Sequence, residues 1–294
     1  NEHERMRPAS VTKIMTLLLV MEALDAGKIG WDDSITTSTE AAAKGGSQVY
    51  LKEGEQMSLK DMLKSVVVSS ANDCATALAE HVAGSEGAFV DRMNQRAREL
   101  GMADTHFVNC TGLDDGEGGA EHLTSSYDIA LMSRELLKHP EIRDYTTIWM
   151  DTVRDGRFGL ANTNKLVRFY EGTTGLKTGF TAEAGYCLSA SAMRDGMELI
   201  AVVLDCESST DRFQSAKSLL DYGFDNYQNY DIIEKGQYLG RTAVKDGMIG
   251  SIDSKAPESL SLPLSEEEYA QIQTEIHVEE QVEAPVKQGD VLGS

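Results

Sequence analysis

The sequence predicts an α/β (α+β) fold: an antiparallel sheet flanked by helices, a helical subdomain beside it, and a small all-β domain after it. Helical apolar spacing recurs through the residues before Pro140. Three strand-like segments then follow one another closely, and a further helix ends this region. From about Tyr230 onward, Val and Ile alternate with polar residues, which indicates a small β module.

The predicted helices each combine an apolar face with a recognisable start or stop. The first begins directly after Pro8-Ala9-Ser10 and ends at Gly27. Ser58, Ser85 and Ser125 are N-cap candidates for three later helices. We expect helices at residues 11–26, 58–68, 72–82, 85–101, 125–139 and 211–222.

The predicted strands lie at residues 175–181, 185–193 and 197–206. The last two are joined across Arg194-Asp195-Gly196, which is typical of a hairpin turn. With the change of composition near Tyr230, this pattern predicts a larger domain at residues 1–228 and a small β domain at residues 229–294.

The net charge of the chain argues against a nucleic-acid partner but does not indicate any other partner. Lys and Arg number 27 against 48 Asp and Glu, so the formal net charge is -21. A field of that sign repels phosphate backbones, so nucleic acid is not an expected partner. The most apolar run, 14–21, is far shorter than the roughly 20 residues that a membrane span needs, and no signal peptide heads the chain.

The cysteines show neither a CxxC pair nor Cys/His zinc spacing, so no metal site is expected. Cys187 and Cys206 lie on predicted neighbouring strands, where a disulfide could form. Buried free thiols are the favoured interpretation for all four, which are Cys74, Cys110, Cys187 and Cys206.

Three short motifs carry the candidate chemistry, and each occurs once. In chain order they are S-x-x-K at Ser10–Lys13, S-x-N at Ser70–Asn72 and K-T-G at Lys177–Gly179. Alone, the first could be a helix cap followed by a solvated lysine, and chance gives S-x-x-K or S-x-N about once in a chain of this length. Their order and their places on the predicted elements favour a site instead. The combination is a signature of penicillin-binding proteins and class A β-lactamases.

The S-x-x-K spacing provides an activated nucleophile. A serine hydroxyl attacks well only when a neighbour removes its proton. Residues three apart share a helix face, so the amine of Lys13 can reach the oxygen of Ser10. Burial or a second nearby cation would lower the pKa of Lys13 and supply the neutral amine that this task requires.

The other two motifs supply a proton relay and a binding edge. Ser70 can pass a proton between Lys13 and a leaving amine, and Asn72 can hold the lysine and a substrate carbonyl. On the K-T-G strand, we expect a positive charge from Lys177, a hydroxyl for a carboxylate from Thr178, and close approach of a substrate backbone at Gly179. The N–H groups of Phe180 and Ser10 could form an oxyanion hole.

Longer segments resemble the low-molecular-mass D-alanyl-D-alanine carboxypeptidases among the penicillin-binding proteins, over about residues 2–228. They are Pro8–Thr16, Ser69–Asp73, Thr105–Phe107 with Gly112–Asp114, Gly175–Thr181, Ala184–Leu188 and Asp211–Phe213. The tail is similar to the β domain that follows the catalytic domain in this family, which has a β-lactamase/transpeptidase-like fold.

The resemblance implies a serine peptidase that removes the terminal D-Ala from peptidoglycan pentapeptide stems through an acyl-enzyme and is inhibited by β-lactams. It implies extracytoplasmic action and no metal or organic cofactor. It also implies that Arg212 helps to receive the substrate carboxylate and that His122 lines the cleft. A surface arginine at a helix end is the alternative for Arg212.

Two departures from the family pattern concern the ends of the chain. Only nine residues precede Ser10, whereas the family has β-strands before the nucleophile helix, so N-terminal strands are expected to be missing and the β domain truncated. The amphipathic anchoring helix of many members is absent too, so membrane contact is expected only through segments outside this chain.

Three rival functions remain at this point. A class A β-lactamase shares the motifs, but it needs a glutamate in an E-x-x-L-N loop, and no glutamate between Asn72 and Lys177 has that pattern. A D,D-endopeptidase would use the same residues on cross-linked peptides, although the β module favours the carboxypeptidase. A catalytically silent wall-binding protein is the third rival, and the complete motif set disfavours it.

Overall fold

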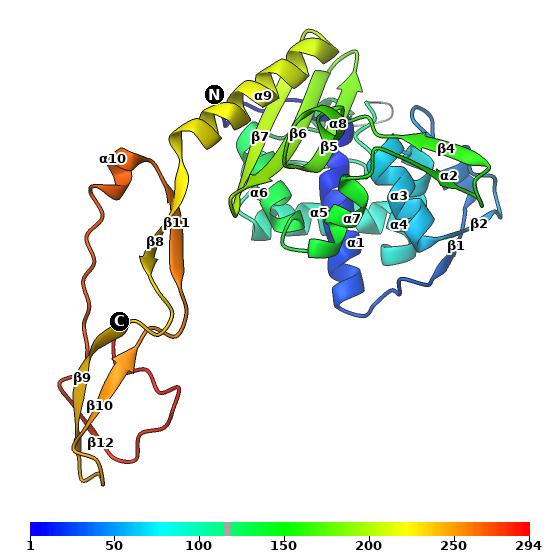
Figure 1. Ribbon diagram of the computed structural model, residues 1–294. Helices are drawn as coiled ribbons and strands as arrows, with labels where there is room; N and C mark the ends of the chain where they lie inside the picture. Colours follow the sequence, from blue (N-terminus) through cyan, green and yellow to red (C-terminus); the bar gives the residue numbers. More distant parts are fainter. Residues whose placement is uncertain (115–118) are drawn as a thin grey trace. The chain divides into compact units, whose positions relative to one another are not determined.

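The computed structural model describes residues 1–114 and 119–294, which form two compact units (Figure 1). The first unit comprises Asn1–Arg194 and Glu198–Asp221, and the second comprises Asp195–Met197 and Tyr222–Ser294. No helix among these residues has both the length and the apolar composition to cross a bilayer.

A three-stranded sheet organises the first unit, as the sequence predicts. Its strands lie in the order β5 (Thr173–Thr181), β6 (Gly185–Arg194) and β7 (Met197–Cys206). β5 pairs with β6 in antiparallel register, with Lys177 opposite Ser189. β5 is an edge strand of this sheet, so its second edge is available for contacts with other parts of the unit.

The first helix forms the core beside this sheet. A 3₁₀ turn, η1 (Ala9–Thr12), leads directly into α1 (Lys13–Asp25). α1 is buried on almost every side, and Figure 1 shows it in blue beside β5. Because η1 and α1 contact both β5 and the helices α4 to α6 (Asn72–Ala83, Glu86–Glu99 and Ser126–Leu136), the residues at the start of α1 lie where the sheet meets the helical cluster.

The helical cluster follows the predicted helices closely. It contains α3 (Leu59–Ser69), α4 (Asn72–Ala83), α5 (Glu86–Glu99) and α6 (Ser126–Leu136). The hydroxyls of Ser58, Ser85 and Ser125 each accept a hydrogen bond from the backbone N–H three residues ahead, which confirms all three caps. The last long helix, α9, follows the sheet and spans Ser209–Asn226.

Several short elements were not expected from the sequence. Two small antiparallel hairpins pair β1 (Ser34–Thr36) with β2 (Gln56–Ser58) and β3 (Met150–Val153) with β4 (Phe158–Ala161). The short helices are α2 (Thr39–Ala42), η2 (Gly119–Glu121), η3 (Pro140–Ile142), α7 (Arg143–Thr146) and α8 (Leu166–Phe169). Elements of three or four residues are too short to show a helical or strand period.

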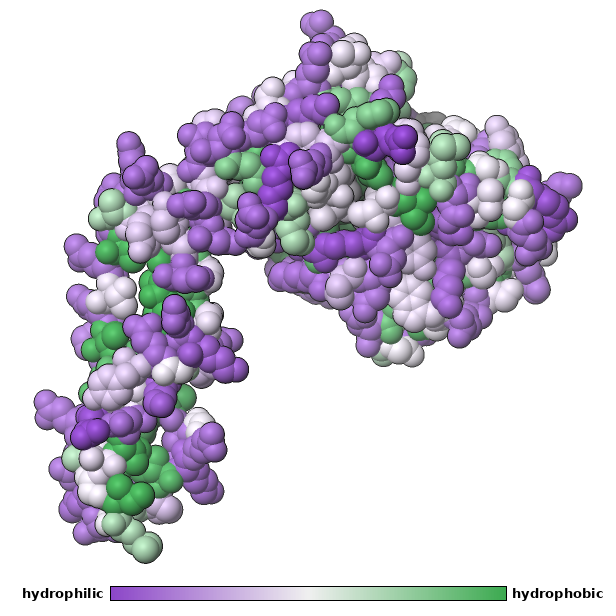
Figure 2. Space-filling view, viewed as in Figure 1, coloured by the Kyte–Doolittle hydropathy of each residue, from purple (hydrophilic) through white to green (hydrophobic). Residues whose placement is uncertain are grey.

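The regular structure of the second unit is almost entirely β. β8 (Gln228–Ile233) pairs with β11 (Leu260–Leu264), and β9 (Tyr238–Lys245) lies between β10 (Ser251–Lys255) and β12 (Gln281–Glu283). One helical turn, α10 (Glu266–Tyr269), is capped by Ser265. Figure 2 shows hydrophobic residues on the surface of this unit, and Met248, Ile249 and Leu260 are among the exposed ones. The first unit shows hydrophilic residues over much of the visible face.

Candidate active site

The hydroxyl of Ser10 lies against the amine of Lys13. Nζ of Lys13 is 2.8 Å from Oγ of Ser10 and 2.8 Å from the carbonyl oxygen of Thr111. η1 carries the serine and the first residue of α1 carries the lysine, so the three-residue spacing brings both groups to one side of the chain. Lys13 is 0% exposed, so no bulk water surrounds its amine.

Burial sets the protonation of this lysine. Desolvation lowers the pKa of Lys13 to about 7, and the nearby Cys110 and Asp73 oppose that shift. Near neutral pH a large share of the molecules therefore carries a neutral amine. Such an amine can accept the Ser10 proton, which is the task of a general base.

A loop at residues 109–113 positions the lysine. Oδ1 of Asn109 accepts hydrogen bonds from the N–H of Gly112 (2.7 Å) and of Thr111 (3.1 Å), which closes the turn that aims the Thr111 carbonyl at Lys13. Gly112 has φ +81°, and a Cβ there would lie 1.8 Å from the carbonyl oxygen of Ala9. The roles of Asn109 and Thr111 are not predicted from the sequence, although Asn followed by Gly three residues later is typical of a turn.

The S-x-N turn presents polar atoms without protein partners. Ser70 has a left-handed backbone (φ 63°) between α3 and α4. Its Oγ, like Oδ1 of Asn72, is buried and has no hydrogen-bond partner among the described residues. Nδ2 of Asn72 donates to the carbonyl of Gly45 at 2.7 Å, which fixes the amide. Buried polar atoms are normally paired, so these two are available to a substrate.

Gly46 shows where the S-x-N turn meets the loop at residues 109–113. A Cβ on Gly46 would lie 2.8 Å from Nδ2 of Asn72 and 3.3 Å from a methyl carbon of Leu113. Asp73 anchors the same region, since its carboxylate accepts hydrogen bonds from the N–H groups of Val49 and Leu51. The S-x-N turn and the Lys13 loop are thus neighbours.

The K-T-G strand lies directly against the nucleophile. A Cβ on Gly179 would lie 2.6 Å from the carbonyl oxygen of Pro8 and 3.0 Å from the backbone nitrogen of Ser10. Only glycine permits this approach of β5 to η1. The hydroxyl of Thr178 donates to Oγ1 of Thr163 at 2.6 Å, and Thr163 was not foreseen from the sequence.

Lys177 lies inside the protein and donates to the carbonyl of Thr178 at 2.8 Å. Burial holds the pKa of Lys177 well below its usual value, and repulsion from Lys13 and Arg212 acts in the same direction. The charged form of Lys177 is therefore disfavoured at this buried position. A bound anion would favour the charged form.

Arg212 reaches the same strand from α9. The guanidinium donates to the carbonyls of Gly179 (3.0 Å) and Cys187 (3.3 Å), and its Nε has no partner among the described residues. Arg212 is only 7% exposed, so the structure does not support the alternative of a surface arginine. Phe180, the residue after K-T-G, is exposed, and its ring packs on that of Tyr186.

His122 does not have the environment expected for a cleft residue. It is 2% exposed, its Nε2 lies 2.7 Å from the hydroxyl of Thr12, and its Nδ1 accepts from the N–H of Val108. Burial lowers the pKa of His122 to about 4. Both ring nitrogens are occupied, so His122 packs behind the nucleophile helix and has no free nitrogen for a substrate.

The four cysteines are free thiols. Three are buried and Cys206 is partly exposed. Cys187 donates weakly to backbone carbonyls rather than bonding to Cys206. The favoured interpretation of free thiols agrees with the structure.

Two family models match the chain. Residues 1–208 match the D-alanyl-D-alanine carboxypeptidase family, and residues 227–294 match the penicillin-binding protein 5 C-terminal domain. The first match covers well over half of the chain. The chain belongs to the D-alanyl-D-alanine carboxypeptidase family. The sequence-based assignment to this family is thereby confirmed.

Proteins of this family are similar to this chain over all or most of its length. The D-alanyl-D-alanine carboxypeptidase DacF of Bacillus subtilis is 42% identical over 298 residues, covering 100% of this chain and 76% of the relative. Penicillin-binding protein 5 from Haemophilus influenzae has a TM-score of 0.83 at 30% identity, covering 100% of this chain and 86% of that one. Penicillin-binding protein D2 from Listeria monocytogenes, in an ampicillin-bound form, has a TM-score of 0.69 at 33% identity, covering 76% and 90%.

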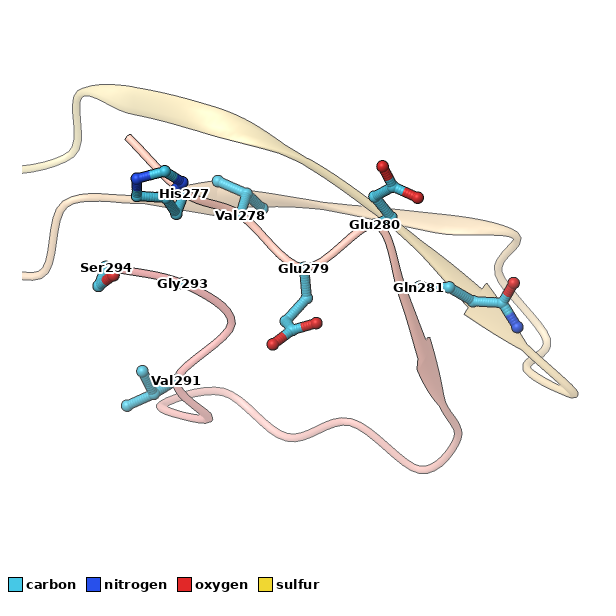
Figure 3. Close-up of a pocket in the computed structure, with 8 residues that line it drawn as sticks. All are labelled: His277, Val278, Glu279, Glu280, Gln281, Val291, Gly293 and Ser294. Atoms are coloured by element: carbon cyan, nitrogen blue, oxygen red, sulfur yellow. The ribbon is translucent and has the colours of Figure 1, made fainter. Parts of the chain in front are cut away.

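A separate pocket lies wholly within the second unit. Its lining includes His277, Glu279, Gln281 and Ser294, and Figure 3 shows that they come from the segment leading into β12, from β12 itself and from the last residues of the chain. None of the predicted site residues belongs to this lining. It is therefore distinct from the carboxypeptidase site.

Proposed function

We propose that this chain is a serine-type D-Ala-D-Ala carboxypeptidase that removes the terminal D-Ala from peptidoglycan pentapeptide stems through an acyl-enzyme on Ser10. The observation that carries the proposal is the 2.8 Å contact between the buried amine of Lys13 and the Ser10 hydroxyl. Membership of the D-alanyl-D-alanine carboxypeptidase family supports the same reaction. Family membership also favours this function over the three rival functions, which are a class A β-lactamase, a D,D-endopeptidase and a catalytically silent wall-binding protein.

Acylation uses the neutral form of Lys13. The amine takes the proton of Ser10 while Oγ attacks the carbonyl carbon of the penultimate D-Ala. The N–H groups of Ser10 and Phe180 would stabilise the developing oxyanion. The peptide C–N bond then breaks, and the proton passes from Lys13 through Ser70 to the amine of the departing D-Ala. Water finally hydrolyses the ester and restores the serine.

The substrate carboxylate would bind at the K-T-G strand. Thr178 offers a hydroxyl, Arg212 offers a buried positive charge, and Lys177 offers a buried amine that becomes charged more readily beside a carboxylate. An incoming carboxylate would raise the lowered pKa of Lys177 and so strengthen its own binding. Asn72, with its free Oδ1, would hold the Lys13 ammonium that forms during the reaction.

The proposal includes inhibition by β-lactams and action outside the cytoplasm. The ampicillin-bound and cefotaxime-bound forms of penicillin-binding protein D2 from Listeria monocytogenes support the first part. The family acts on peptidoglycan, which lies outside the cytoplasmic membrane, and this supports the second part.

Release of D-Ala from a pentapeptide tests this function. The wild-type protein should release one D-Ala per peptide, and Ser10→Ala should release none above the background. Ser218→Ala, at an exposed position on α9, is the matched control and should behave as wild type. Equal release by Ser10→Ala and wild type would refute the proposal.

A further inference from the structure

Glu86, the first residue of α5, is a buried carboxylate that the proposed mechanism does not use. Its two oxygens bind two different segments of the chain. Oε1 accepts hydrogen bonds from the backbone N–H and from the thiol of Cys110, both at 3.1 Å, and Oε2 lies 2.5 Å from Nζ of Lys44. A buried carboxylate is costly unless it is paired in this way, so these contacts hold both segments to α5.

The first of these segments is the loop that holds Lys13. Cys110 directly precedes Thr111, whose carbonyl accepts the hydrogen bond from Nζ of Lys13. The carbonyl of Cys110 accepts a hydrogen bond from the hydroxyl of Thr16 on α1 at 2.6 Å, while its N–H donates to Glu86. Both backbone groups of Cys110 are thus anchored, which fixes the position of the next carbonyl along the chain, the one that contacts Lys13.

The second segment holds the S-x-N turn. Lys44 directly precedes Gly45, whose carbonyl accepts the hydrogen bond from Nδ2 of Asn72. Lys44 also lies 3.6 Å from Glu40, but Glu86 is its closer and more deeply buried partner. The carboxylate of Glu86 therefore connects, through one residue on each side, the carbonyl that holds Asn72 and the carbonyl that holds the general base.

The ion pair keeps its charges near neutral pH. Burial opposes the charge on Glu86, but hydrogen bonds from Lys44 and Cys110 outweigh burial and lower the pKa of the carboxyl. Burial also opposes the charge on Lys44, and the hydrogen bond to Glu86 outweighs it and raises the pKa of the amine. The pair is therefore charged at the pH where Lys13 changes its protonation.

We propose that Glu86 is a positioning residue for the reaction of Ser10, and that its ion pair with Lys44 holds the Lys13 loop and the S-x-N turn at their working separation. The inference rests on the proposed function and deepens it, because it names a group that acts without touching the substrate. Displacing catalytic groups by about 1 Å can cost up to about 10² in rate. Loss of the ion pair should lower kcat and change KM little, since the residues proposed to bind the carboxylate lie on β5 and α9.

Release of D-Ala from a D-Ala-D-Ala peptide tests the proposal. Glu86→Gln keeps the shape of the side chain and an acceptor for Cys110, but it places an amide NH₂ against the ammonium of Lys44. Its kcat should fall about tenfold to a hundredfold, with KM within about twofold of wild type. Lys44→Met should show a similar loss, and Lys44→Arg, which can keep the ion pair, should retain most of the wild-type kcat.

A double variant and a control separate this role from general destabilisation. Glu86→Gln/Lys44→Met should lose no more than either single variant, because both changes remove one interaction. Glu135→Gln is the matched control, since its carboxylate is also paired in the first unit, with Arg96 and Lys138, and it should behave as wild type. The final extent of penicillin labelling counts the competent molecules, so that kcat is compared per labelled chain.

Several results would overturn the proposal. They are a kcat within about twofold of wild type in Glu86→Gln and Lys44→Met, a loss confined to KM, multiplied losses in the double variant, or an equal loss in Glu135→Gln. If Glu86→Gln does not fold, the comparison of Lys44→Met with Lys44→Arg decides, and equal kcat in those two would refute the role of the ion pair. If wild type neither releases D-Ala nor reacts with penicillin, the proposed function itself is wrong.

Discussion

At the residue scale, the protonation of Lys13 controls whether Ser10 can be activated. Its pKa is lowered to about 7 by burial, so protonation below that pH removes the general base. The rate of penicillin labelling should fall about tenfold per pH unit on the acid side of that value. A stopped-flow or gel-based labelling series against pH measures this.

The matched variant is Lys13→Ala. It should label at least about 10² times more slowly and lose the pH step near neutrality. A Lys13→Ala protein that keeps the wild-type rate and profile would show that another group is the base.

The burial of His122 leads to a second prediction, that the free energy of unfolding depends on pH. Its pKa is lowered to about 4 in the folded protein, against 6.5 when unfolded. Between those values the unfolded chain binds more protons, so the free energy of unfolding decreases as the pH falls from 6.5 towards 4. The decrease from this residue should be about 3 kcal/mol. Urea unfolding at several pH values measures it.

His122→Gln provides the comparison for that series. This variant lacks the titrating ring, so its unfolding free energy should vary less over the same pH interval. An unchanged pH dependence in His122→Gln would assign the acid sensitivity to other groups.

At the element scale, packing of the 109–113 loop on η1 predicts unequal effects for two glycines. Gly112 and Gly84 have φ of +81° and +86°, but a Cβ on Gly112 would meet the Ala9 carbonyl at 1.8 Å, whereas Gly84 has open space. Gly84→Ala should lose about 1 kcal/mol of stability from backbone strain and keep its labelling rate. Gly112→Ala should displace η1 and lose most labelling. Equal labelling rates in the two variants would contradict the packing.

Helices and strands could be predicted from the sequence where the periodic pattern of apolar residues is long enough or a helix cap is clear. The helices that follow Ser58, Ser85 and Ser125 and the three central strands were found in this way. The hairpins β1–β2 and β3–β4 were not, because three- or four-residue strands are stabilised by tertiary pairing rather than by local pattern.

The candidate site shows the same division. The sequence predicts that Ser10 and Lys13 lie on one side of the nucleophile helix. It also predicts the helix, turn and strand on which the three motifs lie. Two contacts of the site could not be predicted in this way: that of Thr163 with Thr178, and the hydrogen bonds of Asn109 that close the loop beside Lys13. Both depend on tertiary structure and leave no local sequence pattern that shows which groups they position. Motif sequence alone also could not show that both ring nitrogens of His122 are already occupied.

At the scale of the whole molecule, the first unit contains every predicted site residue. Three segments far apart in the chain meet there: the start of the nucleophile helix, the turn between α3 and α4, and the edge strand β5. Burial at this junction lowers the pKa of Lys13, so the same fold positions the amine beside Ser10 and favours the neutral form that the proposed reaction requires.

Intact-mass analysis after incubation with a penicillin, followed by peptide mapping, tests this account most directly. We expect one adduct per chain, located on the peptide that contains Ser10, and no adduct on Ser10→Ala. An adduct at another residue, or a full adduct on Ser10→Ala, would contradict the assignment of the nucleophile.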